Sequence, residues 1–289
     1  NAASMENSGF EFSATYRNRD HAFKYDISAN LSTLKNKVTS LGIGKDSYIS
    51  GAYATYVGQE IGQFYGWVYE GIARTQTDLD NHATQQGANV GDCLYKDISG
   101  PEGTPDGVID AYDQTVLGSG LPKVNFGLST HMEYKGFDLN ISTYGVLNYH
   151  VSDDIYNSLN SCYGYGNKEV GMLDANRWSE DGTYLSSVPR TYAANNATLA
   201  WNDLFSSRKI QNAAYWKIAN VELGYNFPDK WFGGYVSGVR LYVSAQNLYT
   251  FTGYHGYNVD YAGGTFTPGY NFCSFPSART FMAGLHFTF

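Results

Sequence analysis

The chain has 289 residues, with 19 basic and 27 acidic side chains and a formal net charge of −8. Because Lys and Arg form no cluster, the composition excludes a nucleic-acid-binding protein. No run of about 18 apolar residues occurs, which excludes a helical membrane span but not spans made of strands. The abundance of Tyr, Phe, Thr and Gly favours strands and turns, so the sequence predicts an all-β fold.

Segments in which apolar and polar residues alternate predict about seven strands. In chain order they lie at 10–17, 23–32, 124–134, 137–143, 215–227, 239–249 and 279–289. Six charged side chains of these segments stand on the polar faces: Lys24, Asp26, Glu133, Asp138, Glu222 and Arg240. We therefore predict that the apolar faces contact lipid and that these six side chains point to the interior of a barrel.

The last predicted strand has the clearest alternation. Its apolar face carries Phe281, Ala283, Leu285, Phe287 and, at the chain terminus, Phe289. A strand of this length that ends on an aromatic residue is typical of the closing strand of an outer-membrane barrel. A strand of a soluble sandwich has the same alternation, so that alternative stays open.

The connections between the predicted strands alternate between short and long. The short ones are 17–22, 135–136 and 228–238, and the long ones are 36–123, 148–213 and 250–278. If the C-terminus is periplasmic, every short turn is periplasmic and every long loop is extracellular, as in outer-membrane barrels. Seven strands are too few to close such a barrel, and lipid excludes an open sheet edge. We therefore expect residues 1–289 to be the C-terminal part of a larger barrel.

Seven motifs follow one another along the chain: NSGFE at 7–11, GQFYGWVYEGI at 62–72, GDCLYKD at 91–97, DGVIDAYD at 106–113, YKGFDL at 134–139, QNLYTFTGYHG at 246–256 and FPSARTF at 275–281. In this order they resemble the SusC/RagA-like TonB-dependent transporters of Bacteroidetes outer membranes. The resemblance implies a 22-stranded antiparallel transmembrane β-barrel with long extracellular loops. This chain would supply about its last seven strands, without the plug and the N-terminal strands.

The resemblance also implies a function and partners. It implies an outer-membrane nutrient importer that takes up oligosaccharides or oligopeptides captured with a SusD-like surface lipoprotein. The TonB complex would act through the N-terminal part that this chain lacks, and the lipid bilayer would surround the barrel. The alternative is a secreted carbohydrate-binding β-sandwich or a glycosidase, which would have shorter strands and loops at both ends.

Catalytic motifs are not apparent. The six His residues show neither an HExxH motif nor a His/Cys spacing, no G-x-S-x-G motif occurs, and Asp153-Asp154 is more typical of a solvated pair. We therefore expect a protein that is not an enzyme. Cys93, Cys162 and Cys273 lie far apart in stretches that resemble loops, show no zinc spacing, and are interpreted as structural or incidental.

An acidic stretch in the first long connection could hold a calcium ion. Its candidate ligands are Asp97, Glu102, Asp106, Asp110 and Asp113. In one register Asp97 begins the family's Asp-rich loop with an insertion, and in the other Glu102 begins an EF-hand-like loop. The insertion departs from the family pattern, and Asp113 is shorter than the Glu that usually ends an EF-hand loop, so an acidic turn that packs the loops is the alternative.

Aromatic residues are dense in the long connections. The best candidates for substrate contact are Trp178, Trp201, Tyr163 and Tyr257. Flat rings stack on sugar faces or accept peptide side chains, and Tyr hydroxyls supply hydrogen bonds. The alternative for each ring is packing of the loops against one another or against the lipoprotein. A second departure from the family is Asn258-Val259-Asp260, where Asp-Pro-Glu is usual.

Overall fold

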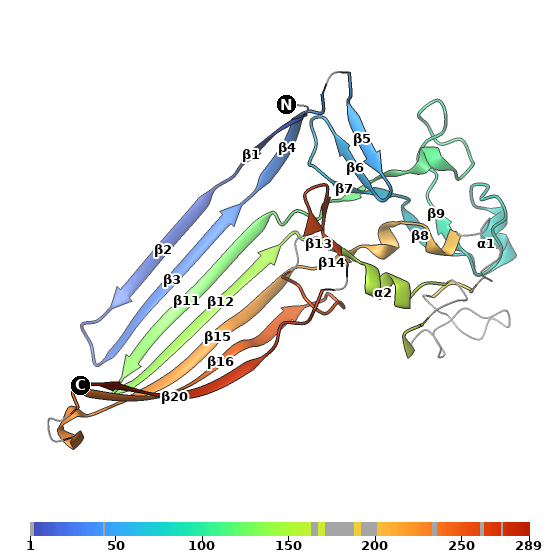
Figure 1. Cartoon of the computed structure of the whole chain (residues 1–289). Helices are drawn as coiled ribbons and strands as arrows, with labels where there is room; N and C mark the ends of the chain where they lie inside the picture. The colour runs from blue at the N-terminus through green and yellow to red at the C-terminus, as the bar shows by residue number, and fades with distance from the viewer. Residues whose placement is uncertain are drawn as a thin grey trace.

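A long antiparallel sheet dominates the computed structural model (Figure 1). The structure describes residues 3–42, 44–162, 167–170, 188–191, 201–232, 236–260, 263–272 and 274–289. Within these residues, seven strands form the sheet in the order β2-β3-β11-β12-β15-β16-β20. They are β2 (Glu11–Asn18), β3 (Phe23–Thr33), β11 (Val124–Tyr134), β12 (Phe137–Leu147), β15 (Tyr215–Phe227), β16 (Gly238–Thr252) and β20 (Thr280–Thr288). The seven predicted strands are confirmed.

The short connections lie together at one end of this sheet. Between β11 and β12, Lys135 and Gly136 have φ angles of 49° and 86°, the left-handed conformation that a two-residue hairpin turn needs. The chain end lies at the same end of the sheet, where the Ser237 N–H donates to the Thr288 carbonyl over 2.7 Å. The long connections lie at the opposite end, as Figure 1 shows.

The pairing register joins the apolar faces of the strands into one surface. Met132 pairs with Leu139, and Leu139 pairs with Leu223. Leu223 in turn pairs with Val243, which pairs with Ala283. Many large side chains of this face are exposed, among them Leu223 and Val243. An exposed apolar surface of this extent marks contact with a membrane or a partner.

Aromatic side chains border this surface at both ends. Near the short turns, the rings of Phe137 and Tyr225 are 4.7 Å apart, and Phe227 continues the row. Near the long connections, Trp216 stacks on Phe251 at 5.4 Å. The two rows are separated by roughly 30 Å along β15, which at the usual tilt is about 23 Å across a membrane. This spacing matches the apolar band between the aromatic girdles of outer-membrane barrels.

The opposite face of the sheet carries the six predicted charges. Arg240 donates to Asp138 at 2.5 and 2.9 Å and to Glu222 at 2.7 Å. Gly224 leaves the space that the guanidinium crosses, because a Cβ there would lie 2.4 Å from it. Lys24 pairs with Glu133 at 3.7 Å, and Asp26 faces His131 across the β3–β11 pair. The register of the strands therefore places the six charged side chains on one face of the sheet, as predicted.

The long connections contain regular structure that the sequence analysis treated as loops. The first holds β4 (Lys35–Ser40), which pairs with β1 (Ser4–Ser8), and then β5 (Ser47–Ser50), β6 (Tyr53–Tyr56), β7 (Gln63–Gly66), β8 (Tyr69–Ile72), α1 (Gln76–Asp80), β9 (Cys93–Tyr95), the 3-10 helix η1 (Ala111–Asp113) and β10 (Thr115–Gly118). These strands are too short for their alternation to identify them.

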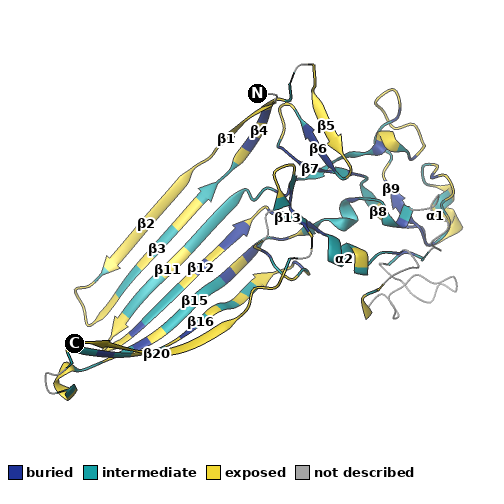
Figure 2. Ribbon diagram, viewed as in Figure 1, coloured by how far each residue is buried: buried dark blue, intermediate teal, exposed yellow. Residues whose placement is uncertain are grey.

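The other connections are similar. They contain β13 (His150–Asp153), α2 (Asp154–Leu159), η3 (Ser207–Lys209), β14 (Gln211–Asn212), β17 (Gly263–Gly264), β18 (Thr267–Pro268) and β19 (Tyr270–Asn271), while η4 (Asp229–Phe232) lies in a short connection. Among the described residues, no helix is long and apolar enough to cross a membrane. In Figure 2, β2 is exposed along nearly its whole length, whereas β11, β12 and β15 are more covered.

Buried polar networks fasten the long connections together. Asp92, which is 1% exposed, accepts from Arg190 at 2.7 and 3.0 Å and from Asn202 at 2.8 Å, which joins the first connection to the second. Asp153 accepts from the hydroxyl of Tyr254 and from Asn271, which joins the second to the third. Burial raises the pKa of the Tyr254 phenol, so it stays protonated and donates.

Two cysteines lie among these contacts. Cys93 is in β9 and not in a loop, contrary to the prediction, and both Cys93 and Cys162 are fully buried free thiols. Burial raises the pKa of Cys93 to about 12 and that of Cys162 to about 11. Cys273 lies outside the described residues. Since the thiolate is the reactive form, these two thiols are inert at neutral pH.

Candidate functional site

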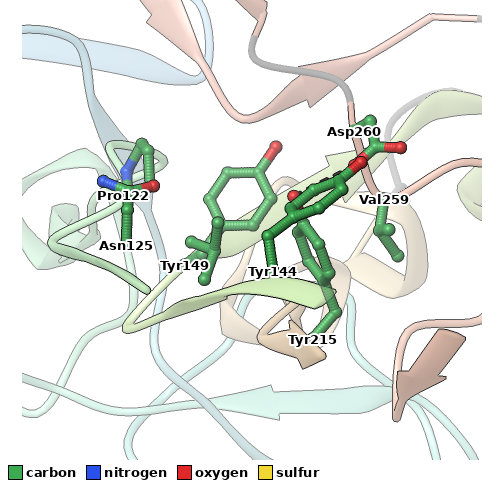
Figure 3. A pocket seen from close by; sticks show the side chains of 8 residues that line it. Pro122, Asn125, Tyr144, Tyr149, Tyr215, Val259 and Asp260 are labelled. Carbon is green, nitrogen blue, oxygen red and sulfur yellow. Dashed lines mark hydrogen bonds between the residues drawn. The ribbon is translucent and has the colours of Figure 1, made fainter. Parts of the chain in front are cut away.

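A segment of the third connection folds over the charged face where the sheet meets the long connections. Its central residue is Asp260, whose carboxylate accepts from the hydroxyls of Tyr144 at 3.1 Å and Tyr215 at 3.0 Å and from the Lys217 ammonium at 2.6 Å. Figure 3 shows Tyr144 and Tyr215 below Asp260. Three donors from β12 and β15 thus hold this connection against the sheet.

A β-bulge in β15 aims two of these donors at the site. Ser142 pairs with Asn220 and the next residue, Thr143, pairs with Ile218, so Ala219 is an extra residue. From Asn220 to Phe227 the even-numbered residues of β15 face the charged side, whereas from Tyr215 to Ile218 the odd-numbered ones do. Without the extra residue Lys217 would lie on the apolar face beside the aromatic row, where a Lys costs up to about 1 kcal/mol.

The arrangement forms an open cavity of about 350 Å³ between the sheet and the third connection (Figure 3). It is lined by Pro122, Asn125, Tyr144, Val146, Tyr149, Tyr215, Val259 and Asp260. Strands β11, β12 and β15 supply its floor, and residues 259–260 supply one wall. Its volume lies within the range of small-molecule sites.

A second cavity, of about 330 Å³, is lined in part by the same segment. Its lining includes Lys217, Asn247, Tyr257, Asn258 and Arg279. Lys217 connects the two cavities: its side chain lines the second, and its ammonium group binds Asp260, which lines the first. The segment 256–260 therefore lines both cavities, with Val259 common to the two.

The predicted substrate residues have different positions. Tyr257 lines the second cavity and is 60% exposed. Trp201 lines neither cavity: its indole N–H donates to the Gln86 carbonyl at 2.9 Å, and its ring packs 6.2 Å from that of Tyr95. Tyr163 and Trp178 lie outside the described residues. The contact of each ring with substrate stays a prediction.

The carboxylates of the predicted calcium site are separated and engaged with the backbone. Asp113 accepts from the N–H groups of Ile98, Ser99 and Asp110, the last in a capping box in which the Asp110 side chain caps the start of η1. Asp97 accepts from the Gly107 N–H, Asp106 from the Val108 N–H and Asp110 from the Tyr112 N–H. Among the described residues, which include all five candidates, no group of three His, Cys, Asp or Glu is placed to hold a metal. The calcium site, including Glu102, stays a prediction that this geometry does not favour.

The sequence analysis missed the residues that build the first cavity. Tyr144, Tyr149, Tyr215 and Lys217 were not singled out, and Asp260 was noted only as a departure from the family pattern. One signal was available: Lys217 is odd-numbered, as are the apolar residues of β15 below it. A charge out of phase with the alternation indicates a bulge or a strand end.

Comparisons with known proteins agree with this architecture. No protein-family model matches the sequence. The chain is 30% identical over 308 aligned residues to TonB-dependent receptor P3 of Formosa agariphila, with 100% of this chain and 29% of the relative covered. It is 26% identical to the TonB-dependent receptor SusC of Bacteroides thetaiotaomicron, with 100% of this chain and 27% of that protein covered.

A solved structure has the same fold. The RagAB peptide transporter superposes with a TM-score of 0.79 at 22% identity, covering 100% of this chain and 29% of the other. The chain thus spans about three-tenths of the length of its relatives. These relatives are receptors and transporters, which supports a non-enzymatic protein at the level of the family. Over its whole length the chain resembles the SusC/RagA-like TonB-dependent transporters, and its sheet is part of a β-barrel of the outer membrane.

Proposed function

We propose that this chain is the C-terminal barrel part of an importer that takes up oligosaccharides or oligopeptides in a TonB-dependent manner. The observation that carries the proposal is the two-faced sheet: an apolar surface between two aromatic rows on one side, and ion pairs with two cavities on the other. A lipid-facing exterior and a polar interior are what a transmembrane barrel needs.

Further strands complete the barrel in this proposal. The sheet has β2 and β20 as its edges, and both are exposed along nearly all of their length. Unpaired N–H and C=O groups of such edges have no partner in lipid. Strands from the rest of the protein would pair with both edges, and a plug would face the charged side of the sheet.

The cavities at the outer end of the charged face are the proposed substrate-contacting region. Tyr257 belongs to the second cavity, and Trp201, Trp178 and Tyr163 are retained as candidates in the long connections. The networks around Asp92 and Asp153 make these connections one firm unit. Such a unit offers a surface on which a SusD-like lipoprotein could close over bound substrate.

Deletion of the gene in the source bacterium tests the proposed function. The wild type, the deletion strain and a TonB-deficient strain are grown on single glycans as carbon source and on a casein peptide digest as nitrogen source. We expect the deletion to abolish growth on at least one of these, with the same loss when TonB is absent. Normal growth of the deletion strain on every source would contradict the proposal.

A further inference from the structure

The one acidic side chain that lines the first cavity is already paired with a cation. Among its eight lining residues, Asp260 is the only one with an ionised side chain. Its carboxylate is bound by the Lys217 ammonium at 2.6 Å and by two phenols. A cationic ligand would have to compete with Lys217, and an anionic ligand would meet the carboxylate. The lining therefore favours an uncharged ligand.

The cavity offers one exposed aromatic ring and one free amide. Tyr144 is 36% exposed, whereas Tyr149 and Tyr215 are 3% and 8% exposed. The side-chain amide of Asn125 has no hydrogen-bond partner among the described residues, although it lines the same cavity (Figure 3). A ring face accepts the C–H face of a sugar, and an amide both donates to and accepts from sugar hydroxyls.

The walls do not suit the main chain of a peptide. Peptides commonly bind by adding a strand to a free sheet edge. Here Asn125 pairs with Val146 and Val146 pairs with Tyr215, so the strands below the cavity are all paired with one another. Recognition must therefore come from side chains, which suits a compact ligand more than an extended one.

We propose that this cavity is a subsite for one uncharged sugar unit of an imported oligosaccharide, which stacks on Tyr144 and hydrogen-bonds to the amide of Asn125. The inference rests on the proposed function and narrows its substrate class. Asp260 and Lys217 position the ring of Tyr144: Asp260 accepts from its hydroxyl, and the Lys217 ammonium lies 5.8 Å from its ring centroid. The lipoprotein would deliver the chain end that enters.

Growth phenotypes separate this inference from the proposed function. The deletion strain is grown on neutral polysaccharides (starch, a β-glucan, a mannan and a xylan), on charged ones (polygalacturonate, alginate and chondroitin sulfate) and on casein peptides. We expect a growth defect on a neutral polysaccharide. A defect confined to charged polysaccharides or peptides would overturn the sugar subsite but leave the importer function standing. No defect on any source would overturn both.

Variants of the full transporter then test the residues. Binding of fluorescently labelled oligosaccharide from the affected neutral polysaccharide is measured on the purified complex with its lipoprotein. We expect Asn125→Ala to weaken affinity about 3- to 10-fold and Tyr144→Ala more than about 10-fold. Tyr144→Phe keeps the ring but loses the hydroxyl through which Asp260 positions it, so we expect a loss of affinity smaller than that of Tyr144→Ala.

The control is Tyr112→Ala, because Tyr112 is also an exposed tyrosine but lies in η1, away from both cavities. Asn125→Ala removes no side-chain hydrogen bond to any residue that the structure describes, so its result does not depend on how well Tyr144→Ala folds. Affinity that is unchanged in Asn125→Ala, or lowered equally by Tyr112→Ala, would overturn the subsite.

Discussion

The strongest physical prediction concerns the two faces of β11. Leu128 and Ser129 are neighbours at the middle of this strand, and both are exposed. Leu128 pairs with Ala29 and Thr143 on the apolar face, whereas Ser129 pairs with Ser28 and Ser142 on the charged face. The same substitution at the two positions therefore compares lipid with barrel interior at one depth.

We expect Leu128→Arg to destabilise the full transporter by about 2–4 kcal/mol, the cost of an Arg on the lipid face near mid-bilayer. This corresponds to roughly a 30- to 900-fold change in the folding equilibrium. Ser129→Arg is expected to cost less than about 1 kcal/mol, because its partners are small and water or plug can solvate the guanidinium. The difference between the two variants is the measured quantity.

The assay is guanidinium-dependent folding of the full transporter into phosphatidylcholine vesicles, followed by the gel mobility of the folded form. Midpoints and slopes give the free energies. The level of each variant in the outer membrane of cells provides a second reading. Equal destabilisation by both variants, or greater destabilisation by Ser129→Arg, would refute the assignment of faces.

Three further outcomes follow from the connections. Asp153→Ala should destabilise the second and third connections by about 2–4 kcal/mol, because the buried Tyr254 hydroxyl loses its acceptor, Asn271 loses one of its two acceptors and the Tyr156 N–H loses its cap. Local hydrogen exchange measures this, with the neighbouring Asp154→Ala as a nearly neutral control. Cys93 and Cys162 should react with iodoacetamide at pH 8 more than about 100-fold slower than a free thiol, since pKa values of about 12 and 11 leave almost no thiolate. Rapid labelling of the folded protein would contradict the burial of these two thiols. Chelation by EDTA should leave the melting temperature of the protein unchanged, because the carboxylates around Asp113 bind backbone N–H groups. A fall of several degrees that added calcium reverses would instead establish the metal site.

The long strands could be predicted from the sequence because their pattern is set by two solvents. Lipid on one side and a polar interior on the other impose alternation over about ten residues, as from Phe23 to Leu31 and from Val124 to Tyr134. The tight turn at Lys135-Gly136 is likewise a local property. Strands such as β17 and β18, with two residues each that pair with one another across a short turn, are too short to carry such a pattern.

The cavity could not be predicted for a related reason. Asp260 is 116 residues from Tyr144 in the chain, and only the folding of the third connection brings them together. The bulge at Ala219 reverses which residues of β15 face inward, and alternation read from its lower half places Lys217 on the wrong side. Trp201, by contrast, was proposed for its ring, yet that ring packs within the connections.

The pair formed by Lys217 and Asp260 gives the last prediction. The Lys217 side chain is 5% exposed and that of Asp260 is 26% exposed. Removing one partner leaves an unpaired charge, at a typical cost of about 3–5 kcal/mol for a fully buried pair, so we expect about 3 kcal/mol for Asp260→Asn. Lys217→Met should cost about 2 kcal/mol, because the carboxylate keeps two phenol donors and some solvent.

The double variant Lys217→Met/Asp260→Asn tests whether the two side chains stabilise the third connection as an ion pair or through two independent contacts. Since it leaves neither charge buried alone, we expect it to recover at least about 1 kcal/mol relative to the sum of the single variants. Hydrogen exchange of the amides at 253–260 reports directly on whether the third connection stays closed over the sheet. If protection falls in proportion to the sum of the single effects, the two side chains do not act as a pair, and the neutral lining inferred for the first cavity loses its basis. If protection is restored, the ion pair holds the segment in place, and the cavity keeps its shape without presenting a net charge to its ligand.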